Sequence, residues 1–140
     1  MKFIGANLRR FGVAVLTMVL VATSFALFTP PAAAETYKVK LGSDKAMLVF
    51  DPPKLTIQPG DTVEWVNNKV PPHNVVFDAA KNPNKSADLA KGMSHKQLLM
   101  TPGQEVKTTF PEDTPEGDYT YYCEPHRGAG MVGTISVKKS

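Results

Sequence analysis

The sequence predicts an all-β fold, a sandwich or barrel of about seven or eight strands with one short helix. Two observations predict it: short runs in which apolar and polar residues alternate, and the proline and glycine signals that separate these runs. No internal repeat or low-complexity tract interrupts the pattern. We therefore expect a single β domain.

The expected strands follow one another along the chain, each bounded by a turn signal. Tyr37, Val39 and Leu41 alternate with lysines, and Pro59-Gly60-Asp61 is a turn in which proline presets φ and glycine supplies flexibility. The expected strands are residues 37–41, 48–50, 55–57, 62–67, 74–77, 106–110, 119–123 and 134–137.

Between Asp78 and Met100 the alternation loosens, and the sequence favours one short helix. Ser86 is a suitable N-cap, helix formers follow it, and Gly92 is a suitable end. His95 has polar neighbours and no partner ligand nearby in the sequence, so we expect it to be exposed.

Residues 1–34 are predicted to be a signal peptide that is removed, which leaves the domain at residues 35–140. Lys2, Arg9 and Arg10 precede an apolar stretch, and Ala32-Ala33-Ala34 offers a cleavage site of small residues. The alternative is an uncleaved membrane anchor, because the apolar stretch just reaches a spanning length. The alanine sequence favours cleavage. The residues that would complete a twin-arginine signal around Arg9-Arg10 are missing, so export by the general route is expected.

The charge pattern excludes nucleic acid as a partner. The chain has 16 basic and 13 acidic residues, and three of the basic ones lie in the predicted signal peptide, so 13 of each remain in residues 35–140. This near-neutral domain lacks basic runs interleaved with aromatic residues. A single cysteine in an exported protein cannot form an internal disulfide, which leaves a free thiol, an intermolecular bridge or a metal ligand.

One short loop combines three soft metal ligands. Residues 123–131 read CEPHRGAGM and contain the single cysteine, Cys123, with His126 and Met131. Thiolate, imidazole and thioether together favour copper, and two histidines and a cysteine with a distant axial methionine form the blue-copper arrangement. Among the three histidines, His73, which follows two prolines and precedes an apolar run, is the best candidate for the second imidazole.

Each of these residues has a more ordinary interpretation when taken alone. Cys123 fits a small buried residue, Met131 a core residue and His73 a polar loop residue. Zinc is disfavoured because it prefers carboxylates to a thioether as its further ligand. A nucleophile and base made of Cys123 and His126 would lack an orienting acid and an oxyanion-forming motif. The combined spacing in an exported all-β chain favours copper.

The two ligand segments resemble those of the plastocyanin family, most of all its cyanobacterial members. The matching segments are PPHNVVF at residues 71–77 and YYCEPHRGAGMVG at residues 121–133, and the resemblance extends over residues 35–140. It implies a cupredoxin Greek-key sandwich with one copper ion that cycles between Cu(I) and Cu(II). The implied ligands are His73, Cys123, His126 and Met131, with Asn74 tuning the potential through hydrogen bonds.

The resemblance also implies a partner surface around His126. Plant members carry two acidic clusters near the equivalent of Tyr122, whereas residues 78–97 here contain only Asp78 and Asp88 among four lysines. Steering by an acidic patch is therefore not expected, and Arg127 is the charge best placed to meet an acidic partner. The expected surface residues are Leu48, Pro72, Leu98, Pro125, Arg127, Gly128, Ala129 and the more remote Tyr122.

The function implied by the resemblance is electron transfer, without enzymatic activity. A monomer in the thylakoid lumen, peripheral to the membrane, would take electrons from cytochrome f and give them to photosystem I in transient complexes. The alternative is a periplasmic copper-binding or copper-delivery protein. Delivery proteins need exposed, exchangeable ligands, often rich in methionine or histidine, whereas this sequence embeds one thiolate between strands.

Overall fold

A computed structural model describes residues 33–139, and residues from Ala34 onward form one compact unit. Nine strands, one α-helix and two short 3-10 helices occur in this part of the chain. The elements are β1 (Thr36–Leu41), β2 (Phe50–Asp51), β3 (Lys54–Ile57), β4 (Thr62–Asn67), β5 (His73–Phe77), η1 (Ala79–Lys81), α2 (Ala87–Met93), β6 (His95–Leu99), β7 (Glu105–Thr109), β8 (Gly117–Tyr122), η2 (Arg127–Ala129) and β9 (Val132–Val137).

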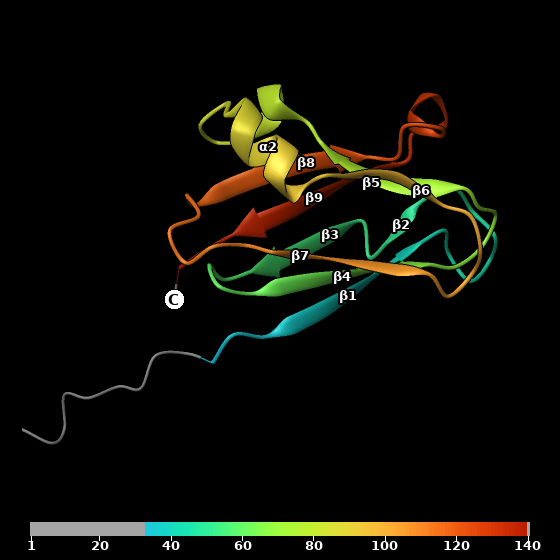
Figure 1. Cartoon of the computed structure of the whole chain (residues 1–140), viewed down its shortest axis with the longest axis horizontal. Helices are drawn as coiled ribbons and strands as arrows, with labels where there is room; N and C mark the ends of the chain where they lie inside the picture. Colours follow the sequence, from blue (N-terminus) through green and yellow to red (C-terminus); the bar gives the residue numbers. More distant parts are fainter. Residues whose placement is uncertain (1–32, 140) are drawn as a thin grey trace, which may run out of the picture. The chain divides into compact units, whose positions relative to one another are not determined.

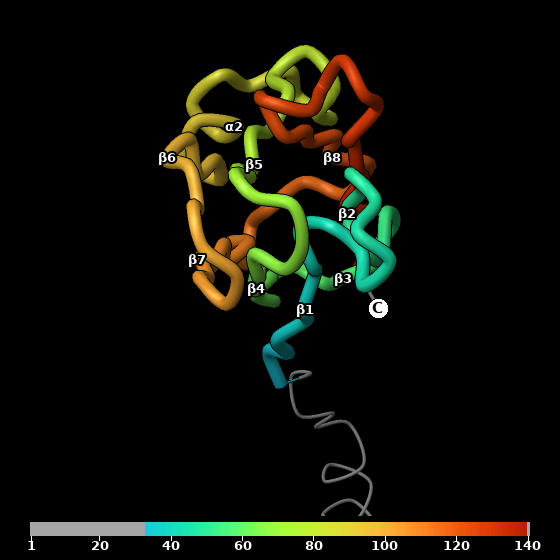
Figure 2. The backbone as a smooth tube through the Cα atoms, turned by 90° about the vertical axis from the view of Figure 1, so that its right-hand side faces the viewer, coloured from blue at the N-terminus to red at the C-terminus, as the bar shows by residue number. Residues whose placement is uncertain are grey.

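The strands form two sheets that pack as a sandwich (Figure 1). One sheet has the order β2-β1-β4-β7 and the other the order β3-β9-β8-β5-β6. The pairs β1–β4 and β3–β9 are parallel, and the remaining pairs are antiparallel. Figure 2 looks along the sandwich from the end at which the loop after β8, drawn in red, turns back. The predicted all-β sandwich is confirmed.

Alternate residues of the facing strands build the core. In β4, Val63, Trp65 and Asn67 are buried while the residues between them are partly exposed, the period of two that the sequence predicts. Tyr121 packs edge-on against Trp65 and Phe50, with ring centroids 4.8 and 4.6 Å apart. Because Trp65 and Phe50 belong to one sheet and Tyr121 to the other, this aromatic cluster joins the two layers.

The predicted short helix is present as α2, but its end differs from the prediction. The Oγ of Ser86 accepts a hydrogen bond from the backbone N–H of Leu89 at 3.2 Å, as expected of an N-cap. Gly92 does not end the helix. It lies in the last turn, and Ser94 is the C-cap, whose backbone N–H bonds to the carbonyl of Lys91. The chain then continues directly into β6.

The strand β6 was not predicted, and it is one reason why the structure has nine strands instead of seven or eight. Among its residues only Leu99 is buried, because β6 is an edge strand that pairs with β5 alone. The prediction of an exposed His95 is also wrong. Its ring is half-buried, with Nε2 3.0 Å from the Oγ1 of Thr108.

Two strand ends position the candidate site. β5 begins at His73 and all of its residues are buried, while β8 ends at Tyr122 and β9 begins at Val132. β5 and β8 are antiparallel neighbours, and Tyr122 at the end of β8 pairs with Val76, so the start of β5 continues past Tyr122 toward the loop that follows β8. Residues 123–131 connect β8 to β9 at that end of the sandwich (Figure 1). Paired strands therefore hold the ligand loop on both sides.

The predicted signal peptide falls almost entirely on residues 1–32, which lie outside the described residues. Cleavage after Ala34 therefore stays a prediction. Among residues 33–139, no helix is both long enough and apolar enough to span a membrane.

Candidate metal centre

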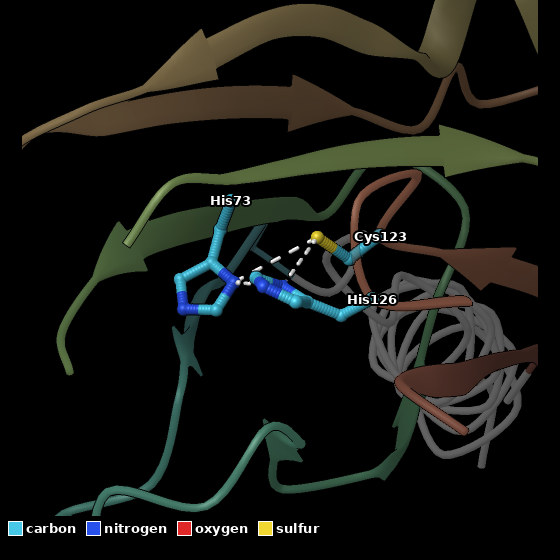
Figure 3. Close-up of side chains that lie close together, drawn as sticks. All are labelled: His73, Cys123 and His126. Carbon is cyan, nitrogen blue, oxygen red and sulfur yellow. Dashed lines mark hydrogen bonds between the residues drawn. The ribbon is translucent and has the colours of Figure 1, made fainter. Parts of the chain in front are cut away.

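Three metal-ligating side chains meet where these strand ends come together (Figure 3). His73 begins β5, Cys123 follows β8, and His126 lies in the loop beyond it. The Sγ of Cys123 lies 3.7 Å from Nδ1 of His73 and 3.5 Å from Nδ1 of His126, and the two Nδ1 atoms are 3.2 Å apart. The structure thus brings together three residues that the sequence singled out.

The hydrogen bond on the far side of His73 determines which ring nitrogen is available to a metal. Its Nε2 lies 2.8 Å from the carbonyl oxygen of Lys69, which can only accept, so Nε2 carries the proton. In the neutral ring Nδ1 then has a lone pair, and Nδ1 is the atom that faces Cys123 and His126. Two imidazoles and one sulfur that face a common point fit a copper ion.

Burial sets the protonation tendencies of the two innermost groups. The side chains of His73 and Cys123 have no exposed surface, whereas His126 is partly exposed. Burial lowers the pKa of the His73 imidazole and raises the pKa of the Cys123 thiol, while backbone hydrogen bonds at Asn74 and His126 partly offset the effect on the thiol pKa. The buried thiol therefore favours its neutral form until a bound cation compensates the thiolate charge.

Backbone hydrogen bonds close the ligand loop on itself. The N–H of Cys123 bonds to the carbonyl of Met131 at 3.1 Å, and the N–H of Met131 bonds to the carbonyl of His126 at 3.2 Å. Between them, Gly130 has a φ of 83°, a left-handed conformation that glycine adopts without strain. Met131 is completely buried. The loop thus ties the backbone of Met131 to that of both other loop ligands.

Asn74 fastens the same loop to β5. Its Oδ1 accepts a hydrogen bond from the N–H of Glu124 at 2.8 Å, and its Nδ2 donates to the Glu124 carboxylate at 2.7 Å and to the carbonyl of Lys96 at 3.0 Å. One buried amide thereby links the strand of His73, the residue after Cys123 and β6. The sequence pointed to Asn74, but not to Glu124 or Lys69, because nothing in the spacing indicates those partners.

The residues expected on the partner surface differ in exposure. Leu98 is 39% exposed, and it precedes Leu99, which pairs with His73 across β5 and β6. The exposed members of the set are Leu98, Pro125, Arg127, Gly128 and Ala129, and the half-buried members are Leu48, Pro72 and Tyr122.

Comparison with known proteins decides the family. The sequence model of the copper-binding proteins of the plastocyanin/azurin family matches residues 37–138. The chain belongs to this family. It is 72% identical over 138 residues to a plastocyanin of Nostoc punctiforme, with 99% of each chain covered. It is 59% identical over 129 residues to a plastocyanin of a Synechococcus strain, with 92% of this chain and 93% of the relative covered.

Solved structures agree with this family. The oxidised plastocyanin of the fern Dryopteris crassirhizoma superposes with a TM-score of 0.61 at 34% identity, covering 72% of this chain and 99% of the fern protein. A pseudoazurin from Sinorhizobium superposes with a TM-score of 0.53 at 28% identity, covering 75% of each chain. The predicted cupredoxin sandwich is therefore confirmed.

Family membership and the donor set together define the biochemical class. The protein is a blue-copper electron carrier and not an enzyme. The predicted copper cofactor is confirmed at the level of the family. The buried positions of His73 and Cys123 also disfavour the copper-delivery alternative, which needs ligands that a second protein can reach.

Proposed function

We propose that this protein carries single electrons from cytochrome f to photosystem I, and that His73, Cys123, His126 and Met131 bind its copper ion. The observation that supports the proposal best is the convergence of two Nδ1 atoms and one Sγ in a chain 72% identical to a cyanobacterial plastocyanin. Met131 is included because its backbone is hydrogen-bonded to both other loop ligands and its side chain is completely buried.

A bound copper ion would supply one-electron chemistry by alternating between Cu(I) and Cu(II). The chain supplies a donor arrangement that is already assembled. The Lys69 carbonyl fixes the orientation of the His73 ring, and the hydrogen bonds of Met131 fix the loop. Because the donors need not rearrange between oxidation states, little reorganisation opposes electron transfer.

Asn74 is proposed to tune the midpoint potential through the hydrogen bonds that hold Glu124 beside Cys123. The variant Asn74→Ala removes these bonds and should shift the potential measured by voltammetry. An unchanged potential would show that Asn74 only supports the fold.

His126 is the proposed exit and entry point for electrons. It is the one histidine of the cluster with exposed surface, and exposed loop residues follow it. A small contact area of this kind suits redox complexes that must dissociate quickly, since such complexes have small interfaces. The proposed contact residues are those of the expected surface, including Leu98 and Tyr122.

We further propose that residues 1–34 direct export to the thylakoid lumen and are then removed. The basic residues before the apolar stretch and the alanines at 32–34 support this proposal. The released domain would act as a monomer on the lumenal side of the thylakoid membrane, without insertion into it. Mass spectrometry of the protein isolated from the thylakoid lumen should find an N-terminus at Glu35.

The test of the ligand assignment is a visible absorption spectrum of the copper-loaded, oxidised domain. We expect an intense blue band from thiolate-to-copper charge transfer, and its loss in Cys123→Ser, which keeps the size of the side chain but removes the sulfur. Flash kinetics with photosystem I and stopped-flow mixing with cytochrome f then test the partners. A blue protein that exchanges electrons with neither would retain the ligand assignment and refute the proposed partners.

A further inference from the structure

Arg127 makes two contacts with residues outside its own loop. The carbon at the centre of its guanidinium group lies 3.9 Å from the centroid of the Tyr122 ring, and Nη2 lies 3.3 Å from Oδ2 of Asp78. Asp78 follows the last residue of β5, 49 residues before Arg127. The structure therefore joins the loop after Cys123 to the far end of the strand that begins with His73.

Asp78 is itself rigidly held, which makes it a suitable anchor. Its backbone N–H bonds to the carbonyl of Thr120 in β8 at 2.9 Å, and its Oδ1 accepts from the N–H of Ala80 at 3.1 Å as the N-cap of η1. The second carboxylate oxygen is the one that contacts Arg127. The side chain of Asp78 is only 17% exposed, against 53% for Arg127, so the fixed partner is the acid.

The guanidinium group keeps donors that these contacts do not use. It carries five N–H donors in a planar fork, and Asp78 is the single acceptor that its side chain contacts among residues 33–139. One face of the plane lies over Tyr122. The two contacts hold the guanidinium plane of Arg127 and leave some of its N–H donors unused. These donors are therefore oriented toward a second carboxylate.

We propose that Asp78 is a positioning residue for electron transfer: it holds Arg127 over Tyr122 so that the remaining N–H donors meet a carboxylate of an acidic redox partner in one orientation. This inference rests on the proposed function for the identity of that partner. Positioning and simple electrostatic steering predict opposite effects of removing Asp78 on the reaction with an acidic partner. Steering predicts that removing an acid favours an acidic partner, whereas positioning by Asp78 predicts that removing this acid disfavours it.

The variant Asp78→Asn separates the two effects. Asparagine retains an oxygen that can cap η1, but its amide NH2 cannot accept from Arg127. Asp88→Asn is the matched control, because it makes the same charge change at an exposed residue in the first turn of α2 that has no ion pair with Arg127. Arg127→Lys is a second variant, which keeps the charge but loses the planar fork.

The first measurement needs no partner protein. In the reduced protein, whose Cu(I) is diamagnetic, the Tyr122 ring should shift the NMR signals of the Arg127 side chain upfield. We expect this shift to collapse in Asp78→Asn and to persist in Asp88→Asn. A shift that persists in Asp78→Asn would overturn the proposal, because Arg127 would then keep its place without the acid.

The second measurement is the second-order rate of oxidation by photosystem I at low ionic strength. We expect Asp78→Asn and Arg127→Lys to be slower than the wild type by about threefold, the size expected of one exposed ion pair, and Asp88→Asn to be equal or faster. Equal acceleration of both Asp→Asn variants would leave only a net-charge effect and would refute positioning.

Oxidation by ferricyanide distinguishes a failure of this inference from a failure of the proposed function. All the variants should react with this small anion at rates that follow net charge alone, because it has no carboxylate for the oriented fork. If the wild type reacts with ferricyanide but not with photosystem I or cytochrome f, the proposed partners are wrong, and the NMR result still decides whether Asp78 holds Arg127.

Discussion

The hydroxyl group of Tyr121 is buried between the sheets and has no hydrogen-bond partner among the described residues. Burial also raises the pKa of this phenol, so it stays neutral. A buried polar group without a partner loses its hydration and gains nothing in exchange. We therefore predict that Tyr121→Phe, which keeps the ring contacts with Trp65 and Phe50, raises the free energy of unfolding by about 1–2 kcal/mol.

Tyr119 provides the matched control, since it is equally buried but its hydroxyl donates to the carbonyl of Pro115 at 2.8 Å. Tyr119→Phe removes a bond that is made and should lower the free energy of unfolding by about 1 kcal/mol. Urea unfolding of the two variants, compared with the wild type, measures both values. Equal destabilisation by the two substitutions would contradict the assignment of Tyr121 as the unpaired group.

At the scale of elements, β9 depends on a glycine. Gly133 faces Tyr121 directly across β8 and β9, and a Cβ on Gly133 would overlap the Tyr121 ring. The φ of Gly133 is not in the left-handed region, so backbone conformation does not require glycine here. The close approach of the Tyr121 ring to the backbone of β9 requires it. We predict that Gly133→Ala lowers the free energy of unfolding by about 1–3 kcal/mol, the range for overpacked cores.

Gly92 is the control for this prediction. Nothing lies within 4 Å of a Cβ at Gly92, and the residue is in the last turn of α2. Gly92→Ala should raise the free energy of unfolding by about 0.5–1 kcal/mol, because alanine has the higher helix propensity. Urea unfolding checks both substitutions. A neutral Gly133→Ala would mean that β9 can move away from Tyr121 at no cost.

The elements that the sequence predicted and those it missed differ in a physical way. β4 was predictable because one face is covered, which forces the alternation of Val63, Trp65 and Asn67. β6 was not, because an edge strand with one buried residue has no such constraint. Gly92 was misread because a glycine signals a helix end only where the chain needs a positive φ, and here Ser94 ends the helix in an extended conformation.

The site shows the same division. Cys123, His126 and Met131 lie in one loop, so their spacing alone indicated a common centre. Contacts between distant segments left no such signal: Glu124 bonds to Asn74 across 50 residues, and Arg127 reaches Asp78 across 49. Such pairs depend on which strand ends become neighbours, and alternation within strands carries no information about that.

At the scale of the whole molecule, one hydroxyl connects the two sheets. Oγ1 of Thr108 in β7 donates to the carbonyl of Met93 at the end of α2 and accepts from Nε1 of Trp65 in β4. His95 in β6, at 3.0 Å, supplies the remaining bond. Since a hydroxyl has one proton and two acceptor sites, His95 must donate, and its Nε2 carries a proton.

This arrangement makes stability depend on pH through His95. Burial lowers the pKa of its imidazole, although a backbone hydrogen bond at Lys107 acts in the opposite direction on that pKa. As the pH falls below about 6.5, the unfolded chain binds a proton at His95 before the folded chain does, so the folded state loses stability. Above that pH both states are neutral at this residue, and no loss occurs.

We predict that His95→Gln, whose amide can still donate to Thr108, reduces the loss of stability between pH 7.5 and pH 5. The two proteins differ only at residue 95, so the difference between their unfolding free energies isolates His95. Urea unfolding at several pH values should give a wild type that weakens relative to the variant as the pH falls. Parallel pH profiles would mean that His95 accepts its proton as easily in the fold as in the unfolded chain, and that the bond to Thr108 tolerates an imidazolium.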